Sequence, residues 1–397
     1  MKKSSETICL DHAAVILPDQ ILEDHTVQMK DGQVIAITPS KKTPAVPSRL
    51  DLQGAYLAPG FIDLHVHGAK SRDAMEATLP AWRAISRYHA SGGTTSLALT
   101  TVASDFPQLE KVLKLAASKP DLEGAALLGI HVEGPCLSLE NSGAHEHTSL
   151  CLPQDMEWEK ILPYAHSITQ ITLAPELAGA HPLIRALKKK NILVSAGHTN
   201  AKDWQMNAAY AAGVDHVTHL FNSMSFCSKL APFRQAGAVE WTLAHPDVHA
   251  ELIADGFHVT STLLRLAYRA KGPNHLILVT DATAGAGLPV GRSFTVGLNQ
   301  RARVHSGYAL TMDGSSLAGS IIRMVDAVRV MTQQTDAPLH ETIRMATLNP
   351  ARRLGLENRI GSIRPGLQAD LVAFDQNFRV LQTWKKGKPI FSAKGKK

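Results

Sequence analysis

The central part of the chain alternates between short apolar runs and longer segments in which apolar residues recur every three or four positions. The short runs are typical of buried strands, and the longer segments have the spacing of amphipathic helices. Eight strands are predicted at residues 61–66, 94–102, 125–132, 168–174, 192–196, 216–220, 249–254 and 275–280. Helices are predicted at residues 79–90, 108–118, 182–190, 201–212, 260–270, 320–335 and 339–347. Repeated strand–helix alternation predicts an α/β fold, namely a (β/α)₈ TIM-like barrel.

The two ends of the chain show a different pattern. Residues 1–57 and the segment from about residue 361 read as short strands separated by turns, such as the Lys-Asp-Gly-Gln turn at residues 30–33. A chain of 397 residues is also too long for one compact core in most folds. We therefore expect a barrel at residues 58–355 and a small β-sandwich domain built from both termini, residues 1–57 and 356–397.

Composition narrows the class of protein. The chain carries 41 basic and 35 acidic residues, and its basic residues are scattered rather than interleaved with aromatics, so no nucleic-acid partner is expected. Its four cysteines form no CxxC pair, which favours thiols in a reducing compartment. We find no signal-peptide core and no run of about 18 apolar residues, and we expect a cytoplasmic protein without membrane contact.

Polar residues with metal-binding chemistry follow several of the predicted strands. In a barrel, the carboxyl ends of the strands meet at one mouth. His65 and His67 are two positions apart on the first strand, so both imidazoles point the same way. Glu133, His198 and His219 end three further strands and form a ligand set that leaves one position open for water. Each signal alone is equally typical of ordinary polar residues, but together they predict a metal-dependent hydrolase.

The sequence also predicts a role or a side-chain direction for three more residues, Asp281, His131 and His216. Asp281 ends the eighth predicted strand, where a carboxylate can accept a proton from water and return it to a leaving group; the alternatives are a helix cap or a metal ligand. His131 faces the same side as Glu133, which favours a supporting contact to that ligand. Strict alternation along the sixth strand predicts that His216 points outward to the helix layer, opposite to His219.

Several segments resemble a known family. Residues 59–68 (Pro-Gly-Phe-Ile-Asp-Leu-His-Val-His-Gly) resemble the opening barrel strand of the amidohydrolase superfamily. Closer still, the chain resembles the N-acetylglucosamine-6-phosphate deacetylase family from about Val34 to Lys388. The matching segments are residues 131–135, 143–145, 173–176, 195–199, 218–224, 254–258, 279–283, 317–320 and 345–351.

The resemblance implies roles for individual residues. Glu133, His198 and His219 would hold a principal divalent metal, commonly zinc, and His65 with His67 would complete a second position. Asp281 would be the general base and then the acid, and His145 would polarise the acetamide carbonyl. The residues implied to contact or border the substrate are Ala144, His145, Asn222, Ser223, Asp255, His258, Leu317, Ala318 and Gly319.

One segment departs from the family pattern. Members usually carry a His-Arg-Glu-Pro-Gly-like stretch after the sixth strand, whose Arg reaches the substrate phosphate, often of a neighbouring subunit. Residues 228–237 replace that stretch here, and Arg234, with Lys229 as the alternative, is the candidate phosphate ligand. The resemblance also implies a homodimer.

The expected reaction follows from the resemblance. It is hydrolysis of N-acetyl-D-glucosamine 6-phosphate to D-glucosamine 6-phosphate and acetate, in amino-sugar catabolism. The alternatives are an N-acetylgalactosamine-6-phosphate deacetylase, another amidohydrolase such as a cyclic-amide hydrolase, and a catalytically silent scaffold. A silent scaffold would lack metal ligands or the Asp at the end of the eighth strand.

Overall fold

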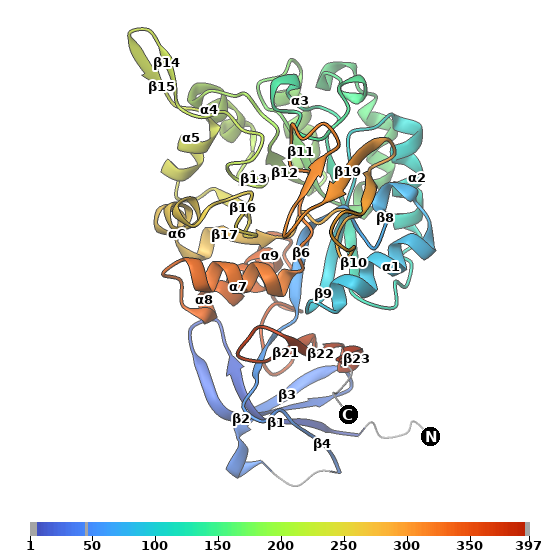
Figure 1. The fold of residues 1–397 in the computed structure, drawn as a ribbon, viewed down its shortest axis with the longest axis vertical. Helices are drawn as coiled ribbons and strands as arrows, with labels where there is room; N and C mark the ends of the chain where they lie inside the picture. The colour runs from blue at the N-terminus through green and yellow to red at the C-terminus, as the bar shows by residue number, and fades with distance from the viewer. Residues whose placement is uncertain (1–5, 44–46, 394–397) are drawn as a thin grey trace.

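A computed structural model describes residues 6–43 and 47–393 (Figure 1). Its centre is a sheet of eight parallel strands that are neighbours in chain order. The strands are β6 (Phe61–Val66), β9 (Thr94–Thr100), β10 (Ala126–Glu133), β11 (Ile168–Leu173), β12 (Leu193–Ala196), β13 (His216–Val217), β16 (His249–Ile253) and β17 (Leu276–Val279). Each lies within about two residues of a predicted strand except at β13, which is shorter than expected. The predicted barrel is therefore confirmed.

The barrel closes between β6 and the segment that follows β17. Val66 pairs with Ala282, and the backbone N–H of Asp281 donates to the carbonyl of His65 at 2.9 Å. The fully buried carboxylate of Asp63 accepts hydrogen bonds from the backbone N–H and hydroxyl of Thr280, at 3.2 and 2.6 Å. Burial raises the pKa of Asp63 to about 7. This closure fixes Asp281 beside the first strand.

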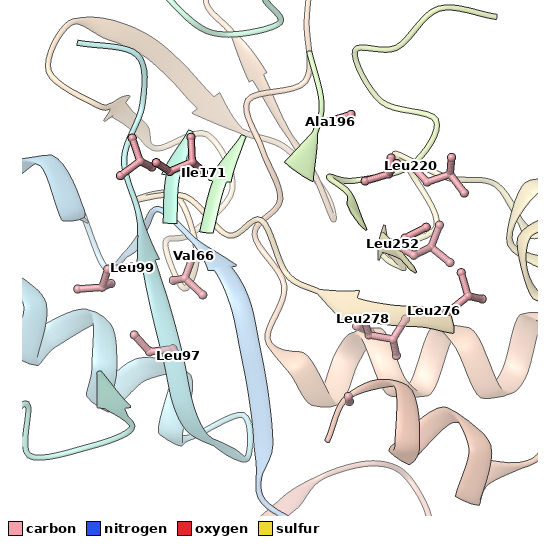
Figure 2. Close-up of a cluster of buried hydrophobic side chains, with 14 of the residues drawn as sticks. Val66, Leu97, Leu99, Ile171, Ala196, Leu220, Leu252, Leu276 and Leu278 are labelled. Carbon is pink, nitrogen blue, oxygen red and sulfur yellow. The ribbon is translucent and has the colours of Figure 1, made fainter. Parts of the chain in front are cut away.

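Helices surround the barrel. They are α1 (Leu79–Ala90), α2 (Phe106–Ala117), α3 (Ala180–Lys188), α4 (Asp203–Ala212), α5 (Ala238–Ala244), α6 (Ser261–His275), α7 (Met324–Gln334), α8 (Leu339–Met345) and α9 (Leu348–Arg353). Local signals set several boundaries: the Asp105 carboxylate caps the N-terminus of α2 at 3.0 Å, and Gly213 ends α4 with a φ of 119°. Figure 2 shows buried side chains such as Leu97 and Leu278, which belong to the apolar layer between strands and helices.

Both chain ends join in a second sheet, which lies below the barrel in Figure 1. Its order is β23-β22-β21-β5-β1-β2-β3, and β4 also pairs with β1. The strands are β1 (Ile8–Ile16), β2 (Ile21–Lys30), β3 (Gln33–Pro39), β4 (Ser48–Asp51), β5 (Tyr56–Pro59), β21 (Leu371–Phe374), β22 (Val380–Lys385) and β23 (Lys388–Ser392). The sheet has its own apolar core, with contributions from both termini, including Val27 and Trp384. The predicted small β domain from the two ends of the chain is confirmed.

Several elements were not predicted. A three-stranded antiparallel sheet, β18 (Ser293–Val296), β19 (Gln300–Val304) and β20 (Ala309–Thr311), follows the eighth barrel strand. A hairpin of β14 (Ser228–Leu230) and β15 (Phe233–Gln235) projects away from the barrel beside α4 and α5 (Figure 1). The remaining short strands are β7 (Gly68–Ala69) and β8 (Arg72–Asp73).

The predicted direction of His216 is wrong. Its Nε2 lies 3.2 Å from the carboxylate of Glu251, whereas Val217 packs in the main apolar cluster. The hydroxyl of Thr218 bonds those of Thr172 and Ser195, so the inward positions are 216 and 218. Alternation then ends, because His219 has a left-handed backbone with a φ of 31°. The prediction counted alternating positions back from His219 and therefore assigned His216 to the wrong face of the sheet.

Candidate active site

Three of the predicted site residues share an unusual backbone conformation. His198, His219 and Asp281 follow β12, β13 and β17 and have φ values of 46°, 31° and 49°. A left-handed backbone is uncommon for residues with a side chain and is concentrated at functional sites. The turn at each residue ends the strand and places the side chain at the barrel mouth, where the three meet residues from β6 and β10.

The carboxylate of Glu133 lies at the centre of the cluster. Its Oε1 is 3.2 Å from the Nε2 atoms of both His198 and His219, which are themselves 3.0 Å apart. Its Oε2 faces the first strand, 3.5 Å from Nε2 of His65 and 3.2 Å from Nε2 of His67. Each oxygen of one buried carboxylate therefore faces a separate pair of imidazoles.

These two groups have the chemistry of cation sites. Nδ1 of His198 lies 2.8 Å from the carbonyl oxygen of Asn141, which can only accept, so the proton belongs on Nδ1 and Nε2 presents a lone pair to Glu133. Nε2 atoms of His65 and His67 are 3.1 Å apart, a separation at which two lone pairs repel unless a proton or cation lies between them. Nitrogen and carboxylate ligands of this kind suit zinc and similar divalent ions. The described residues can thus hold a metal ion at either group.

A buried carboxylate that the sequence analysis missed lies directly beneath His65. Glu251, on β16, contacts His65 Nδ1 at 3.4 Å and His216 Nε2 at 3.2 Å, and it accepts a hydrogen bond from the Gln170 amide at 2.8 Å. The contact favours the tautomer of His65 in which Nε2 is free to bind a metal. Glu251 lies in the middle of β16, and no motif in the sequence around it indicates this role.

His131 supports the cluster through His65 rather than through Glu133. Its Nε2 instead bonds the Thr172 hydroxyl at 2.7 Å, and its ring packs edge-on against the ring of His65 with centroids 4.5 Å apart. Burial lowers the pKa of His131 to about 3, so the ring is neutral. It supports the position of His65 by packing.

Asp281 lies at the edge of the first-strand pair. Its Oδ1 is 3.4 Å from Nε2 of His65 and 3.2 Å from Nε2 of His67. Gly319 permits this arrangement, because a Cβ at that position would lie 2.7 Å from the carbonyl oxygen of Asp281. The adjacent Ser320 N–H donates to the same oxygen at 2.8 Å. Residue 319 therefore holds the backbone of Asp281 as well as bordering the cavity.

His145 is a neutral donor that points into the site. The backbone N–H of Ala103 donates to its Nδ1 at 3.0 Å, so its own proton is on Nε2. That nitrogen lies 3.4 Å from Glu133 Oε2. Burial lowers the pKa of His145 to about 4, which keeps the ring uncharged at neutral pH.

A cavity of about 230 Å³ opens above the cluster. Of the predicted substrate residues, it is lined by Ala144, His145, Asn222, Ser223, His258, Leu317 and Gly319. Asp255 lies behind His258 and fixes it through a 2.7 Å contact between Oδ2 and Nδ1. Although burial alone would lower the pKa of His258, the hydrogen bond to Asp255 raises it. Ala318 is fully buried behind the lining.

Arg234 is not brought to this cavity. It lies on β15 of the projecting hairpin and is exposed. The sequence analysis also missed lining residues Val102, Thr283, Val296 and Ser316. Val296 belongs to β18 and Ser316 follows β20, so the unpredicted sheet supplies part of the cavity wall.

The chain is similar to known amidohydrolases. The amidohydrolase family model matches residues 56–390. The chain is also 34% identical to the N-acetylglucosamine-6-phosphate deacetylase of Bacillus subtilis (strain 168), over 98% of each protein. The chain belongs to the N-acetylglucosamine-6-phosphate deacetylase family of amidohydrolases. This deacetylase family was the one predicted, and membership makes the chain a hydrolytic enzyme rather than a scaffold.

Two further relatives are similar to the chain over most of its length. An N-acetylgalactosamine-6-phosphate deacetylase from Escherichia coli O157:H7 is 34% identical, over 92% of this chain and 94% of the relative. The crystal structure of the N-acetylglucosamine-6-phosphate deacetylase from Pasteurella multocida matches with a TM-score of 0.90 and 30% identity, covering 98% of this chain and 100% of the other. Among the described residues, no helix is long and apolar enough to cross a membrane.

Proposed function

We propose that the enzyme hydrolyses the N-acetyl group of N-acetyl-D-glucosamine 6-phosphate, yielding D-glucosamine 6-phosphate and acetate in amino-sugar catabolism. The observation that carries the proposal is the meeting of Glu133, His198, His219 and Asp281 with a neutral donor, His145, around one cavity. This set combines a cation site, a base and an electrophilic donor, which are the parts that amide hydrolysis requires. The identity of the substrate is inferred from the family to which the chain belongs.

The metal is proposed to be zinc, held by Glu133, His198 and His219, with a second ion at Glu133, His65 and His67. When bound, it supplies positive charge that acidifies water and polarises a carbonyl. Asp281 takes the proton from the attacking water. Its ionised state is favoured because, although burial alone would raise its pKa, the neighbouring His65 and His67 lower it to about 2.

The proton of His145 Nε2 is directed at the position where charge develops on the acetamide oxygen. A neutral donor with a fixed tautomer needs no reorganisation as that charge grows. Asp281 then gives its proton to the departing amine, and acetate and the amino sugar leave. Asp281 is left ionised and His145 keeps its Nε2 proton, so both groups are ready for the next cycle.

Recognition of the sugar phosphate is assigned to residues that line the cavity and to Arg234. His258 has a raised pKa and lines the cavity, so it can place positive charge near the sugar. Asn222 and Ser223 also line the cavity. We assign Arg234 to the phosphate of a partner subunit in a homodimer, because its hairpin projects from the barrel and its side chain is exposed (Figure 1).

Four free thiols and a phosphorylated substrate favour a cytoplasmic location.

The second candidate substrate is the galacto isomer, because a deacetylase named for that isomer is as similar in sequence as the first relative described. The two substrates differ only at C4, so the residues of the metal group do not discriminate between them.

The test compares acetate release from the two hexosamine phosphates by the zinc-loaded enzyme and by Asp281→Asn. We expect the gluco substrate to be preferred in kcat/KM. The Asn variant should keep its metal content and lose kcat by about 10³-fold or more, since an amide cannot accept the proton. Equal activity in the variant would refute the role of Asp281, and preference for the galacto substrate would reassign the reaction.

A further inference from the structure

Two cysteines lie close together at the two ends of the segment that carries His145. Cys136 follows Glu133 by three residues, and Cys151 follows His145 by six. Their sulfur atoms are 3.9 Å apart, and both are free thiols. The backbone N–H of Cys151 also donates to the carbonyl of Pro135 at 3.2 Å, so the two ends of the segment lie side by side here.

We propose that Cys136 and Cys151 are an oxidisable pair, and that a disulfide between them displaces His145 and slows the enzyme. The pair is thus a modification site beside the catalytic cluster, reached by a small oxidant such as hydrogen peroxide.

The surroundings of the pair allow one thiol to react first. Cys136 is fully buried, whereas Cys151 is half-buried and lines a neighbouring cavity of about 610 Å³ that also contacts Ala144 and His145. The contact with Cys136 lowers the pKa of the Cys151 thiol, and the same contact, together with burial, raises the pKa of Cys136. Cys151 is therefore both the more accessible thiol and the better nucleophile.

The chemistry needs only peroxide. The Cys151 thiolate attacks one peroxide oxygen and breaks the O–O bond, forming a sulfenic acid and, with one proton, water. The thiol of Cys136 then attacks the Cys151 sulfur, its proton leaves with the hydroxyl as a second water, and the S–S bond forms. Two thiols are oxidised by two electrons, and one peroxide is reduced to two waters.

Forming the bond requires one or both sulfur atoms to move. A disulfide has an S–S distance of about 2.05 Å, so the present separation has to shorten by about 1.9 Å. Cys136 is packed in the core and its carbonyl accepts a hydrogen bond from Ala174 at 2.8 Å, so the larger adjustment is assigned to the half-buried Cys151. In the proposed oxidised state, the shift at Cys151 extends into the segment before it, which contains His145. A displacement of about 1 Å in a catalytic group can cost about 10²-fold in rate.

The test treats the metal-loaded enzyme with hydrogen peroxide, removes the excess, and measures two quantities. Mass spectrometry of a digest detects a linked peptide containing residues 136 and 151, with the loss of two hydrogens. Acetate release gives kcat before and after treatment with dithiothreitol. The activity readout rests on the proposed deacetylation, whereas the linked peptide is detected without any substrate.

We expect the linked peptide to appear, kcat to fall by tenfold or more, and the reductant to restore it. Cys151→Ser should keep the untreated kcat and resist peroxide, while Cys227→Ser, which removes an exposed thiol elsewhere, should remain sensitive. If Cys136→Ser fails to fold, Cys151→Ala serves as the second resistant variant. Absence of the linked peptide, a linked enzyme with unchanged kcat, or equal inactivation of Cys151→Ser would each overturn the proposal.

Discussion

Replacing Glu251 with Gln is expected to weaken the metal position at His65 and His67 while the barrel stays folded. Three side-chain nitrogen atoms, of His65, His216 and Gln170, lie 3.4, 3.2 and 2.8 Å from the carboxylate oxygens. A carboxylate only accepts hydrogen bonds, whereas an amide of the same shape presents one N–H₂ group to these neighbours. If that group faces His65, Nδ1 becomes an acceptor and the proton moves to Nε2, where it competes with a metal.

The magnitude follows from the burial of the contact. Removing the group that orients a histidine ligand costs about 10- to 100-fold in metal affinity, or about 1.4–2.8 kcal/mol. Glu251 and His65 are both 0% exposed, so solvent cannot replace the lost charge, and we expect the upper half of that range. The group formed by Glu133, His198 and His219 makes no hydrogen bond to Glu251 and should retain its affinity.

Zinc titration of the metal-free enzyme by calorimetry separates the two positions. The matched control is Glu240→Gln, the same chemical change at a carboxylate that caps α5 away from the site. The reasoning fails if Glu251→Gln binds the second ion as tightly as the wild type, or if both positions weaken equally.

Three further predictions concern stability and metal dependence. Burial lowers the pKa of His89 to about 4, so the unfolded chain binds a proton before the folded protein does as the pH falls below about 6.5. The free energy of unfolding should therefore drop by about 2 kcal/mol between pH 7 and pH 5. Urea titrations at the two pH values should show that His89→Gln removes this part of the pH dependence. Leu278→Ala truncates a fully buried side chain on β17 (Figure 2) and should cost about 2–5 kcal/mol in urea unfolding at pH 7, whereas truncating exposed Leu139 should cost under about 0.5 kcal/mol. Chelation should abolish acetate release and lower the thermal midpoint, because the buried imidazoles and Glu133 then lack a shared cation, and added zinc should restore both; unchanged activity after complete metal removal would contradict the site.

The barrel could be predicted from sequence because its information is local. Each strand is a short apolar run with its own polar end, and α1 begins and ends where the apolar spacing predicts. The same locality explains the small domain, whose strands and turns are readable at both ends of the chain. The three-stranded sheet β18–β20 was missed because its strands are short, although buried and more exposed positions alternate along each of them.

The site was predictable only where the chemistry lies at strand ends. Glu133, His198, His219 and Asp281 stand there, and their convergence follows from the barrel. Glu251 and Asp63 lie within strands, and their partners are 186 and 217 positions away, so no local pattern reveals them. The error at His216 has a related cause, because alternation was extended through a residue whose backbone is left-handed.

The pairing of β5 with β21 has a consequence for biosynthesis. Pro59 lies opposite Leu371, so the sheet joins residues separated by more than 300 positions. A nascent chain can complete its barrel strands while β5 still has an open hydrogen-bonding edge, and such edges pair readily with strands from other molecules. We expect exchange of the C-terminal strands between chains to be the characteristic folding error, since it satisfies that edge with the correct sequence from the wrong copy.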